Sequence, residues 1–469
     1  MSTREHAHGE ARWATPPRGK ATRTAGTRLN GRGVRGATTP GSSFHWCTLE
    51  HEPRRSERVG TDDVVPITTP RRTASPPRGH RVTVLLLFAL TVVGALLAGC
   101  TSAPSPRTGQ QGEAPTPEAP APRITTNPAQ GAVSVSPTAP VTVTVTDGTL
   151  ERVSMTNPAG EQVDGELAPD RTSWTAAEPL GYDSTYTISS TAAGADGTPM
   201  TRTSSFTTLT PRAIAYPSMN PVDGQTVGVG QPLAVYFSEA IEDKQAAEDA
   251  ITIKTEPAVE GAFYWFSDTE VHWRPQEFWE PGTKVTMDID VYGKDLGNGV
   301  YGETDRHATF TIGDAKIARA DGASHQMTVE INGEVVRTIP ISMGEPEFPS
   351  NNGVHVVTQQ HQSYEMDSST YGLAPDEGGY VTTVQYATRI SNGGEFVHAA
   401  PWSVGAQGER NVSHGCINMS TDNARWFYNT FGKGDVVIQT NTGGPQLEPW
   451  DGFGDWQVPW EQWLAGGAS

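Results

Sequence analysis

The sequence predicts a mainly β protein, and three observations support this expectation. Among 469 residues, 50 are Gly and 36 are Pro, which favour short strands joined by turns over long helices. Runs with the composition of strands occur at 141–146 (VTVTVT) and 233–237 (LAVYF). Two similar segments, Asn127-Pro128 and Asn220-Pro221, lie 93 residues apart and each precedes one of these runs, which indicates a repeated unit.

Each repeated unit has the size of a small sandwich domain. Both units continue through a Trp-to-Pro stretch into a further strand, and they close on Phe-Thr strands at 206–208 and 310–312. Units of roughly 90–100 residues with alternating strands and Pro or Gly turns predict immunoglobulin-like β-sandwiches. We therefore expect two of them, at 123–209 and 210–313. Rigid spacing is the expected role, and glycan binding is the alternative.

The region 314–440 again has mainly the pattern of strands, but it includes one clear helix signal. Ser420 can cap a helix over 421–431, and Gly432 can end it. We expect one or two short helices in an otherwise β domain, and the apolar residues of the helix should pack in a core. The predicted strands, each ended by Gly, Pro or Asn, are 326–331, 334–341 and 353–357.

The first 100 residues predict export. Residues 1–81 carry 15 Lys and Arg against seven Asp and Glu with no apolar periodicity, so we expect disorder. Residues 82–100 start with an uncharged apolar run behind a basic flank, which is the layout of a signal peptide. They end in Leu97-Ala98-Gly99-Cys100, which resembles a lipobox whose cysteine is lipidated. An uncleaved membrane anchor is the alternative. An 81-residue leader is long for such a signal, so we expect the true start to lie downstream.

The charge balance changes at this boundary. Residues 1–81 have a net charge of +8 and the whole chain has −19, so the rest of the chain has −27. A strongly acidic exported part argues against nucleic acid as a partner. Residues 101–122 are rich in Pro and Ala and predict a flexible tether.

The candidate chemistry lies around Cys416. This cysteine, one of three in the chain, lies two positions after His414, and His398 lies 18 residues upstream of it. The pKa of a free thiol is about 8.5, and a histidine partner can lower that pKa and accept the proton. Gly415 suits a turn whose backbone N–H groups could hold an oxyanion. An inert buried cysteine and a zinc site of the two histidines and the cysteine are the alternatives.

The pattern His398-Ala-Ala-Pro-Trp402-Ser403 followed by Ser413-His414-Gly415-Cys416-Ile-Asn418 resembles the L,D-transpeptidase catalytic domain, also called the YkuD domain. The resemblance covers roughly residues 314–440 and favours the actinobacterial, mycobacterial-type branch. It implies a YkuD-type β-sandwich in which Cys416 is the nucleophile and His398 the general base. The carbonyl of Ala399 would orient His398, and His414 and Gly415 would supply oxyanion donors.

The same resemblance implies substrate-binding positions around the nucleophile. The segment from Tyr364 to Val381 is predicted to be a long loop that covers the site. In it Met366 would line the donor pocket, and Tyr380 would lie over the cysteine; packing at the surface is the alternative for each. Asn418 occupies a place where many bacterial members carry Arg, whereas the actinobacterial branch has Asn. The implied substrate-binding residues are Met366, Tyr371, Tyr380, Trp402, Ser413 and Asn418; for Trp402 a core role is the alternative.

The tail 441–469 holds four tryptophans in Pro- and Gly-rich surroundings, at 450, 456, 460 and 463. Four Trp in so short a stretch argue against disorder. The resembling branch shares the spacing of the last three, so we expect the tail to pack back between the second sandwich and the catalytic domain. Glycan binding is the alternative.

Together these features predict an enzyme of the outer face of the membrane and the cell wall, tethered by a lipid at Cys100. The resemblance implies that it links two third residues, meso-diaminopimelate, of peptidoglycan stem peptides, and that carbapenems acylate it. No metal or organic cofactor is expected, because a thiolate and backbone donors suffice. Alternatives are an L,D-carboxypeptidase or attachment of a protein to the wall through the same acyl-enzyme, and a non-enzymatic wall-binding lipoprotein.

Overall fold

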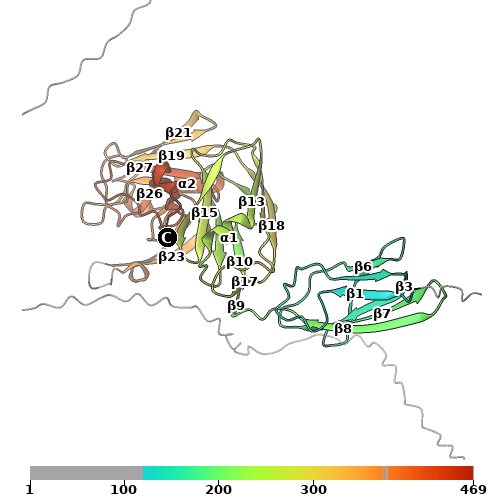
Figure 1. The fold of residues 1–469 in the computed structure, drawn as a ribbon. Coiled ribbons are helices and arrows are strands. Elements are labelled where there is room, and N and C mark those ends of the chain that lie inside the picture. The colour runs from blue at the N-terminus through green and yellow to red at the C-terminus, as the bar shows by residue number, and fades with distance from the viewer. Residues whose placement is uncertain (1–119, 373, 375, 377–378, 468–469) are drawn as a thin grey trace, which may run out of the picture. The chain divides into compact units, whose positions relative to one another are not determined.

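The computed structural model describes residues 120–372, 374, 376 and 379–467, and the fold is mainly β, as predicted (Figure 1). The predicted leader, the signal segment with Cys100 and most of the linker lie outside the described residues. Within the described part of the chain, no helix is both long and apolar enough to cross a membrane.

The first sandwich consists of two four-stranded sheets. In β2 (Thr142–Thr146), Val143 and Val145 are buried while the threonines between and beside them are partly or fully exposed, so the alternation seen in the sequence sets the inner face. One sheet has the order β1 (Arg123–Asn127), β2 (Thr142–Thr146), β6 (Ser173–Ala176) and β5 (Gly165–Leu167). The other has the order β4 (Gln162–Val163), β3 (Gly148–Thr156), β7 (Thr185–Gly194) and β8 (Pro199–Thr207).

The second sandwich repeats this plan, with a short helix α1 (Lys244–Asp249) and a two-stranded addition of β9 (Ala213–Ala215) and β17 (Val300–Gly302). Trp265 and Trp273 fill its core, and the strand predicted at 233–237 is β12. One sheet has the order β10 (Pro217–Asn220), β12 (Leu233–Phe237), β15 (Glu270–Pro275) and β14 (Gly261–Ser267). The other has the order β11 (Thr226–Val227), β18 (Arg306–Ile312), β16 (Lys284–Ile289) and β13 (Ile251–Glu256).

The catalytic region is a third β-sandwich. The predicted strands at 326–331, 334–341 and 353–357 are confirmed to within one residue at their ends as β20, β21 and β22. Its five-stranded sheet has the order β21 (Glu334–Pro340), β20 (Gln326–Ile331), β19 (Lys316–Asp321), β27 (Val436–Thr440) and β22 (Gly353–Val356). Its four-stranded sheet has the order β23 (Gln359–Asp367), β24 (Val381–Arg389), β25 (Phe396–Ala399) and β26 (Ile417–Met419).

The predicted helix at 421–431 is confirmed as α2 (Thr421–Thr430). The Ser420 side chain accepts from the N–H of Asn423 at 3.3 Å, which satisfies one of the free donors at the helix start. Phe427 and Phe431 are buried and stack with ring centroids 4.0 Å apart. The helix packs on β24 and β25 and so supports the sheet that carries the candidate site.

The segment 364–381 differs from the prediction of a continuous loop. Strand β23 extends to Asp367, and β24 begins at Val381, because the two strands pair antiparallel along their length and Asp367 lies opposite Val381. Between them stands a short 3-10 turn, η1 (Ser368–Tyr371). Ladder hydrogen bonds and a buried Met366 outweigh the Gly-rich, polar composition that suggested a loop.

The tryptophan-rich tail contains η4 (Gly454–Gln457) and α3 (Trp460–Trp463), and it contacts two domains. Trp456 Nε1 donates to the carbonyl of Gly230 in the second sandwich at 2.8 Å, while Gln457 Nε2 donates to the carbonyl of Val354 in β22 at 2.6 Å. The guanidinium of Arg274, from β15, lies 4.3–5.3 Å from the ring centroids of three tail tryptophans, 456, 460 and 463. Trp450 is exposed.

Candidate active site

The parallel pairing of β25 and β26 brings the two predicted catalytic residues together. Val397 pairs with Ile417 and His398 with Asn418, so His398 lies within β25 while Cys416 directly precedes β26. Side chains two residues apart on a strand face the same way, so Cys416, Asn418 and the neighbouring His398 share one face. His398 and Cys416, which are 18 residues apart in the sequence, therefore lie next to each other on two paired strands.

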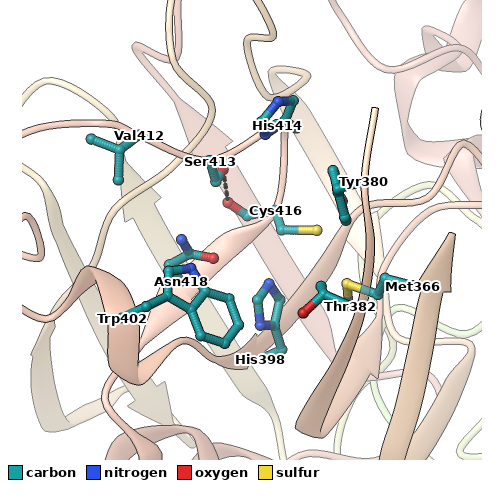
Figure 2. A pocket seen from close by; sticks show the side chains of 10 residues that line it. All are labelled: Met366, Tyr380, Thr382, His398, Trp402, Val412, Ser413, His414, Cys416 and Asn418. Carbon is teal, nitrogen blue, oxygen red and sulfur yellow. Dashed lines mark hydrogen bonds between the residues drawn. The ribbon is translucent and has the colours of Figure 1, made fainter. Parts of the chain in front are cut away.

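These residues line a cavity of about 270 Å³. Figure 2 shows the ring of His398 and the sulfur of Cys416 turned into the same space, with Trp402 and Asn418 on one side and Tyr380 and Met366 on the other. The complete lining is Met366, Tyr380, Thr382, His398, Trp402, Val412, Ser413, His414, Cys416 and Asn418.

The orientation of the His398 ring is set by one backbone group. His398 is buried, and its Nδ1 lies 3.0 Å from the carbonyl oxygen of Ala399. A carbonyl only accepts, so Nδ1 carries the proton and Nε2 of the neutral ring is left as a proton acceptor. Burial lowers the pKa of His398 to about 4, while the bond to Ala399 opposes that change. The ring is therefore neutral at pH 7.

The thiol of Cys416 is also neutral in this structure, contrary to the lowered pKa expected from its histidine neighbours. Burial raises the pKa of Cys416 to about 12; the Phe396 backbone N–H opposes the rise and the Glu395 carboxylate adds to it. The sulfur donates to the carbonyl oxygen of Gly394 at 3.7 Å. Sequence composition around a cysteine does not reveal how far water is excluded from it, and here exclusion of water is the largest influence on the thiol pKa.

The turn that presents Cys416 is closed by the Ser413 hydroxyl. It donates to the carbonyl of Cys416 at 2.6 Å and accepts from the N–H of Gly415 at 3.2 Å. Gly415 has φ +113°, in the region that favours glycine, so this position requires that residue. His414 is held from both sides, because its ring centroid lies 4.6 Å from that of Phe348 and 5.2 Å from that of Tyr380.

The remaining predicted substrate-binding residues divide between two cavities. Asn418 is buried and donates from Nδ2 to the Ser403 hydroxyl at 3.2 Å. Trp402 is 61% exposed at the edge of the first cavity, so it does not take the alternative core role. Tyr371 lines a separate cavity of about 260 Å³, which shares Tyr380 and His414 with the first.

Several residues near the nucleophile were missed by sequence reasoning. Thr382 and Val412 complete the first cavity, and Gly394 holds the thiol. Thr382 lies two residues after Tyr380, so strand alternation could have placed both on one face. Glu395 is buried beside the turn, where Oε1 accepts from the N–H of Asn351 at 2.7 Å. No sequence signal marks this carboxylate as buried.

Among the described residues, no group of three or more His, Cys, Asp or Glu side chains is arranged to hold a metal ion. The polar side chains that line the cavity include the Cys416 thiol and the His398 imidazole, together with those of Tyr380, Thr382, Ser413, His414 and Asn418. Such a set supports nucleophilic and general-base chemistry.

Comparison with known proteins identifies the family. A model described as the L,D-transpeptidase catalytic domain matches residues 315–438, and a bacterial Ig domain model matches residues 132–295. L,D-transpeptidase 2 of Mycobacterium tuberculosis is 46% identical over 385 residues, which cover 82% of this chain and 94% of that protein. The chain belongs to the L,D-transpeptidase family.

Further members of the L,D-transpeptidase family are similar to this chain. L,D-transpeptidase 5 of Mycobacterium tuberculosis is 42% identical, covering 74% of this chain and 77% of that protein. Among solved structures, LD transpeptidase LdtMt1 in complex with imipenem is 36% identical, with a TM-score of 0.43, covering 49% of this chain and 100% of that one. L,D-transpeptidase 3 of Mycobacterium tuberculosis with a faropenem-derived adduct is 35% identical, with a TM-score of 0.40, covering 48% and 97%.

Proposed function

We propose that this transpeptidase uses Cys416 as nucleophile and His398 as general base to join peptidoglycan stem peptides. The observation that carries the proposal is the bond from His398 Nδ1 to the Ala399 carbonyl, which leaves Nε2 as a proton acceptor in the cavity that Cys416 lines. A cysteine is activated when such a base can take its proton at the moment of attack.

The first half-reaction forms an acyl-enzyme. Nε2 of His398 takes the thiol proton, and Sγ of Cys416 bonds to the carbonyl carbon of the third residue of the donor stem, meso-diaminopimelate. The electron pair of the carbonyl moves to its oxygen, where the backbone N–H groups of His414 and Cys416 stabilise it; the N–H of Gly415, which the resemblance also implied as a donor, already donates to Ser413 Oγ. When the carbonyl re-forms, the bond to the terminal D-Ala breaks, and its nitrogen takes the proton from His398.

The second half-reaction transfers the acyl group. The side-chain amine of a diaminopimelate on a neighbouring stem attacks the thioester, its proton passes through His398 to the departing sulfur, and a link between two third residues results. The second cavity, which shares Tyr380 and His414 with the first, supports the use of two peptide substrates. Transfer to water would make the enzyme an L,D-carboxypeptidase, and transfer to a protein amine would attach a wall protein.

We also propose that carbapenems and related β-lactams acylate Cys416. The imipenem complex and the faropenem-derived adduct of relatives support this extension. The strained lactam carbonyl would be attacked in place of the stem carbonyl, and the amine released on ring opening stays within the adduct.

Intact-mass spectrometry with imipenem, on the wild type and on Cys416→Ala, tests the proposal. We expect one covalent adduct on the wild type and none on the variant. In a separate incubation without imipenem, disaccharide-tetrapeptide should give a cross-linked dimer with loss of D-Ala on the wild type and no product on the variant. A folded wild type without an adduct would refute the cysteine mechanism. An adduct followed by tripeptide alone would instead favour the carboxypeptidase.

We further propose that the protein is exported and held at the membrane by a lipid on Cys100, outside the described residues. The support is the sequence alone, from the apolar run before Leu97-Ala98-Gly99-Cys100. Metabolic labelling with an alkyne fatty acid should mark the wild type and leave Cys100→Ala unlabelled. Membrane-bound but unlabelled wild-type protein would favour an uncleaved anchor.

A further inference from the structure

The peptide that precedes the nucleophile is held by a buried hydroxyl from a distant segment. Ser350 Oγ donates to the carbonyl oxygen of Gly415 at 2.7 Å, and Ser350 is fully buried. We infer that Ser350 is a positioning residue, which turns the Gly415–Cys416 peptide so that the N–H of Cys416 serves as an oxyanion donor. The inference rests on the proposed function, because it takes Cys416 as the nucleophile.

Several polar backbone groups of the turn are already hydrogen-bonded within the protein and are not available to substrate. The N–H of Gly415 donates to Ser413 Oγ, and the carbonyl of Cys416 accepts from the same hydroxyl. The carbonyl of Gly415 is taken by Ser350. Within the described residues, the N–H of Cys416 has no intramolecular acceptor. A buried N–H without a partner is uncommon in folded proteins and is available to a ligand.

Peptide geometry links the two ends of this bond. In a trans peptide the C=O and the following N–H point in opposite directions. Ser350 and its neighbours Pro349 and Asn351 do not line the first cavity, although the two neighbours line the second, so a Gly415 carbonyl aimed at Ser350 points away from the first cavity. The N–H of Cys416 therefore points to the opposite side, which is the side of the cavity that Cys416 lines.

Glycine at 415 makes such a hold necessary. The φ of +113° requires glycine, and a Cβ placed there would have its nearest neighbours, atoms of Glu395, only at 3.8 Å. Glycine has no side chain to restrict its dihedral angles, so sterics limit the rotation of this peptide less than they would at another residue. The bond from Ser350 to its carbonyl restrains this peptide directly, in addition to the Ser413 bonds on either side of it.

Ser350 is itself anchored on three sides. Its Oγ accepts from the N–H of Gly344 at 2.9 Å, so the single hydroxyl proton is free to go to the turn. Its carbonyl accepts from Thr442 Oγ1 at 2.6 Å. The next N–H, of Asn351, donates to the buried Glu395 carboxylate at 2.7 Å. Bonds from three separate segments hold the hydroxyl in place.

The proposed role separates two reactions of the same sulfur. In acylation, the attacked carbonyl oxygen gains negative charge, and a donor such as the Cys416 N–H stabilises it. In alkylation by iodoacetamide, sulfur displaces iodide from a CH₂ group, iodide leaves with the bonding electrons, and no oxyanion forms. Loss of the Ser350 hydroxyl should slow acylation and leave alkylation almost unchanged.

The experiment compares Ser350→Ala with wild type in the full chain, with Cys47 and Cys100 changed to Ala in both. Imipenem acylation is followed by intact mass, and alkylation of Cys416 by peptide mass spectrometry at the same pH. We expect Ser350→Ala to acylate about 10–100-fold more slowly, less than the roughly 100–1,000-fold loss for a donor that is removed outright, because the Cys416 N–H is misaligned and not removed. Alkylation should change by less than about twofold, and Ser350→Thr, which keeps the hydroxyl, should recover most of the acylation rate.

A matched control is Ser190→Ala. Ser190 is also buried and donates to a backbone carbonyl, that of Arg202 at 3.3 Å, but it lies in the first sandwich. It should leave both rates unchanged. If Ser350→Ala does not fold, Ser350→Cys, of similar size with a weak donor, makes the same comparison.

The outcomes separate the inference from the proposed function. Acylation of Ser350→Ala at the wild-type rate would overturn the inference alone. A parallel loss of acylation and alkylation would also overturn it, because Ser350 would then act on the fold or on the thiol. A folded wild type that imipenem does not acylate would refute the proposed function itself.

Discussion

His272 and Asp455 form a buried pair, with Nδ1 and Oδ1 2.7 Å apart, although 183 residues separate them in the chain. His272 comes from β15 of the second sandwich, and Asp455 from η4 of the tail. The second ring nitrogen, Nε2, lies 3.0 Å from Glu270 Oε1. The pair therefore fastens the tail to the sandwich through a charge that depends on pH.

This pair predicts a loss of stability on the alkaline side. Burial opposes the His272 charge, but Asp455 and Glu270 outweigh it and raise the pKa of His272 to about 9. Against an unfolded value of about 6.5, the stabilisation is complete below about pH 6.5 and is lost as pH rises through about 9. The free energy of unfolding should fall by on the order of 3 kcal/mol across this window.

Urea unfolding at a series of pH values, with amide exchange at 454–463 as the local probe, measures this effect. His272→Gln should remove most of the pH dependence. His307, an exposed histidine 2.6 Å from Asp288, is the matched control, and His307→Gln should leave the profile unchanged. A wild-type stability that is flat between pH 6.5 and 9.5 would show that the pair does not act in this way.

The neutral pair of His398 and Cys416 predicts an unusual pH profile for acylation. Between a pKa of about 4 for His398 and about 12 for Cys416, both groups stay neutral. Proton transfer should then accompany attack, so the imipenem acylation rate should rise through about pH 4 and stay level to about pH 9. In His398→Ala the rate should instead rise about tenfold per pH unit, since it follows the thiolate fraction.

Stopped-flow acylation at constant ionic strength from pH 3.5 to 9 makes the measurement, with circular dichroism at each pH as the folding control. A wild-type rate that rises only between pH 6 and 8 would indicate a preformed thiolate–imidazolium pair, contrary to this expectation.

We predict that adding even one methyl group at Gly394 reduces both stability and the rate of acylation. Its φ is +100°, and a Cβ there would lie 2.8–2.9 Å from atoms of the Tyr371 ring. Its carbonyl accepts from the Cys416 thiol, so a shift of this backbone moves the nucleophile's partner. Gly394→Ala should reduce stability by about 1–3 kcal/mol and slow acylation by about tenfold.

Gly333→Ala is the control, because Gly333 has φ +84° but no atom within 4 Å of a Cβ. It carries the backbone strain without the contact. Chemical denaturation and imipenem acylation of both variants should show the larger losses in Gly394→Ala. Equal losses of stability, with acylation intact in both, would mean that the Tyr371 contact has no effect.

Much of the fold follows from local sequence. Ser420 marked the start of α2, because a side-chain cap acts within one turn of the chain. The valine alternation at 141–146 set the inner face of β2, because side chains of a strand alternate between its two sides. The long loop expected from Tyr364 to Val381 began too early, because β23 extends to Asp367; its pairing with β24 is a contact between segments and overrides composition.

For the site, the sequence by itself determined which residues lie next to each other. His398 and Cys416 occur in a motif that resembles the transpeptidases, and this motif predicted that both line one cavity. Only the tertiary structure decided how they are charged, since burial raises the thiol pKa that neighbouring histidines were expected to lower. It also brought Ser350 and Glu395 to the turn. Burial and the direction of a hydrogen bond depend on all surrounding segments, so no local pattern encodes them.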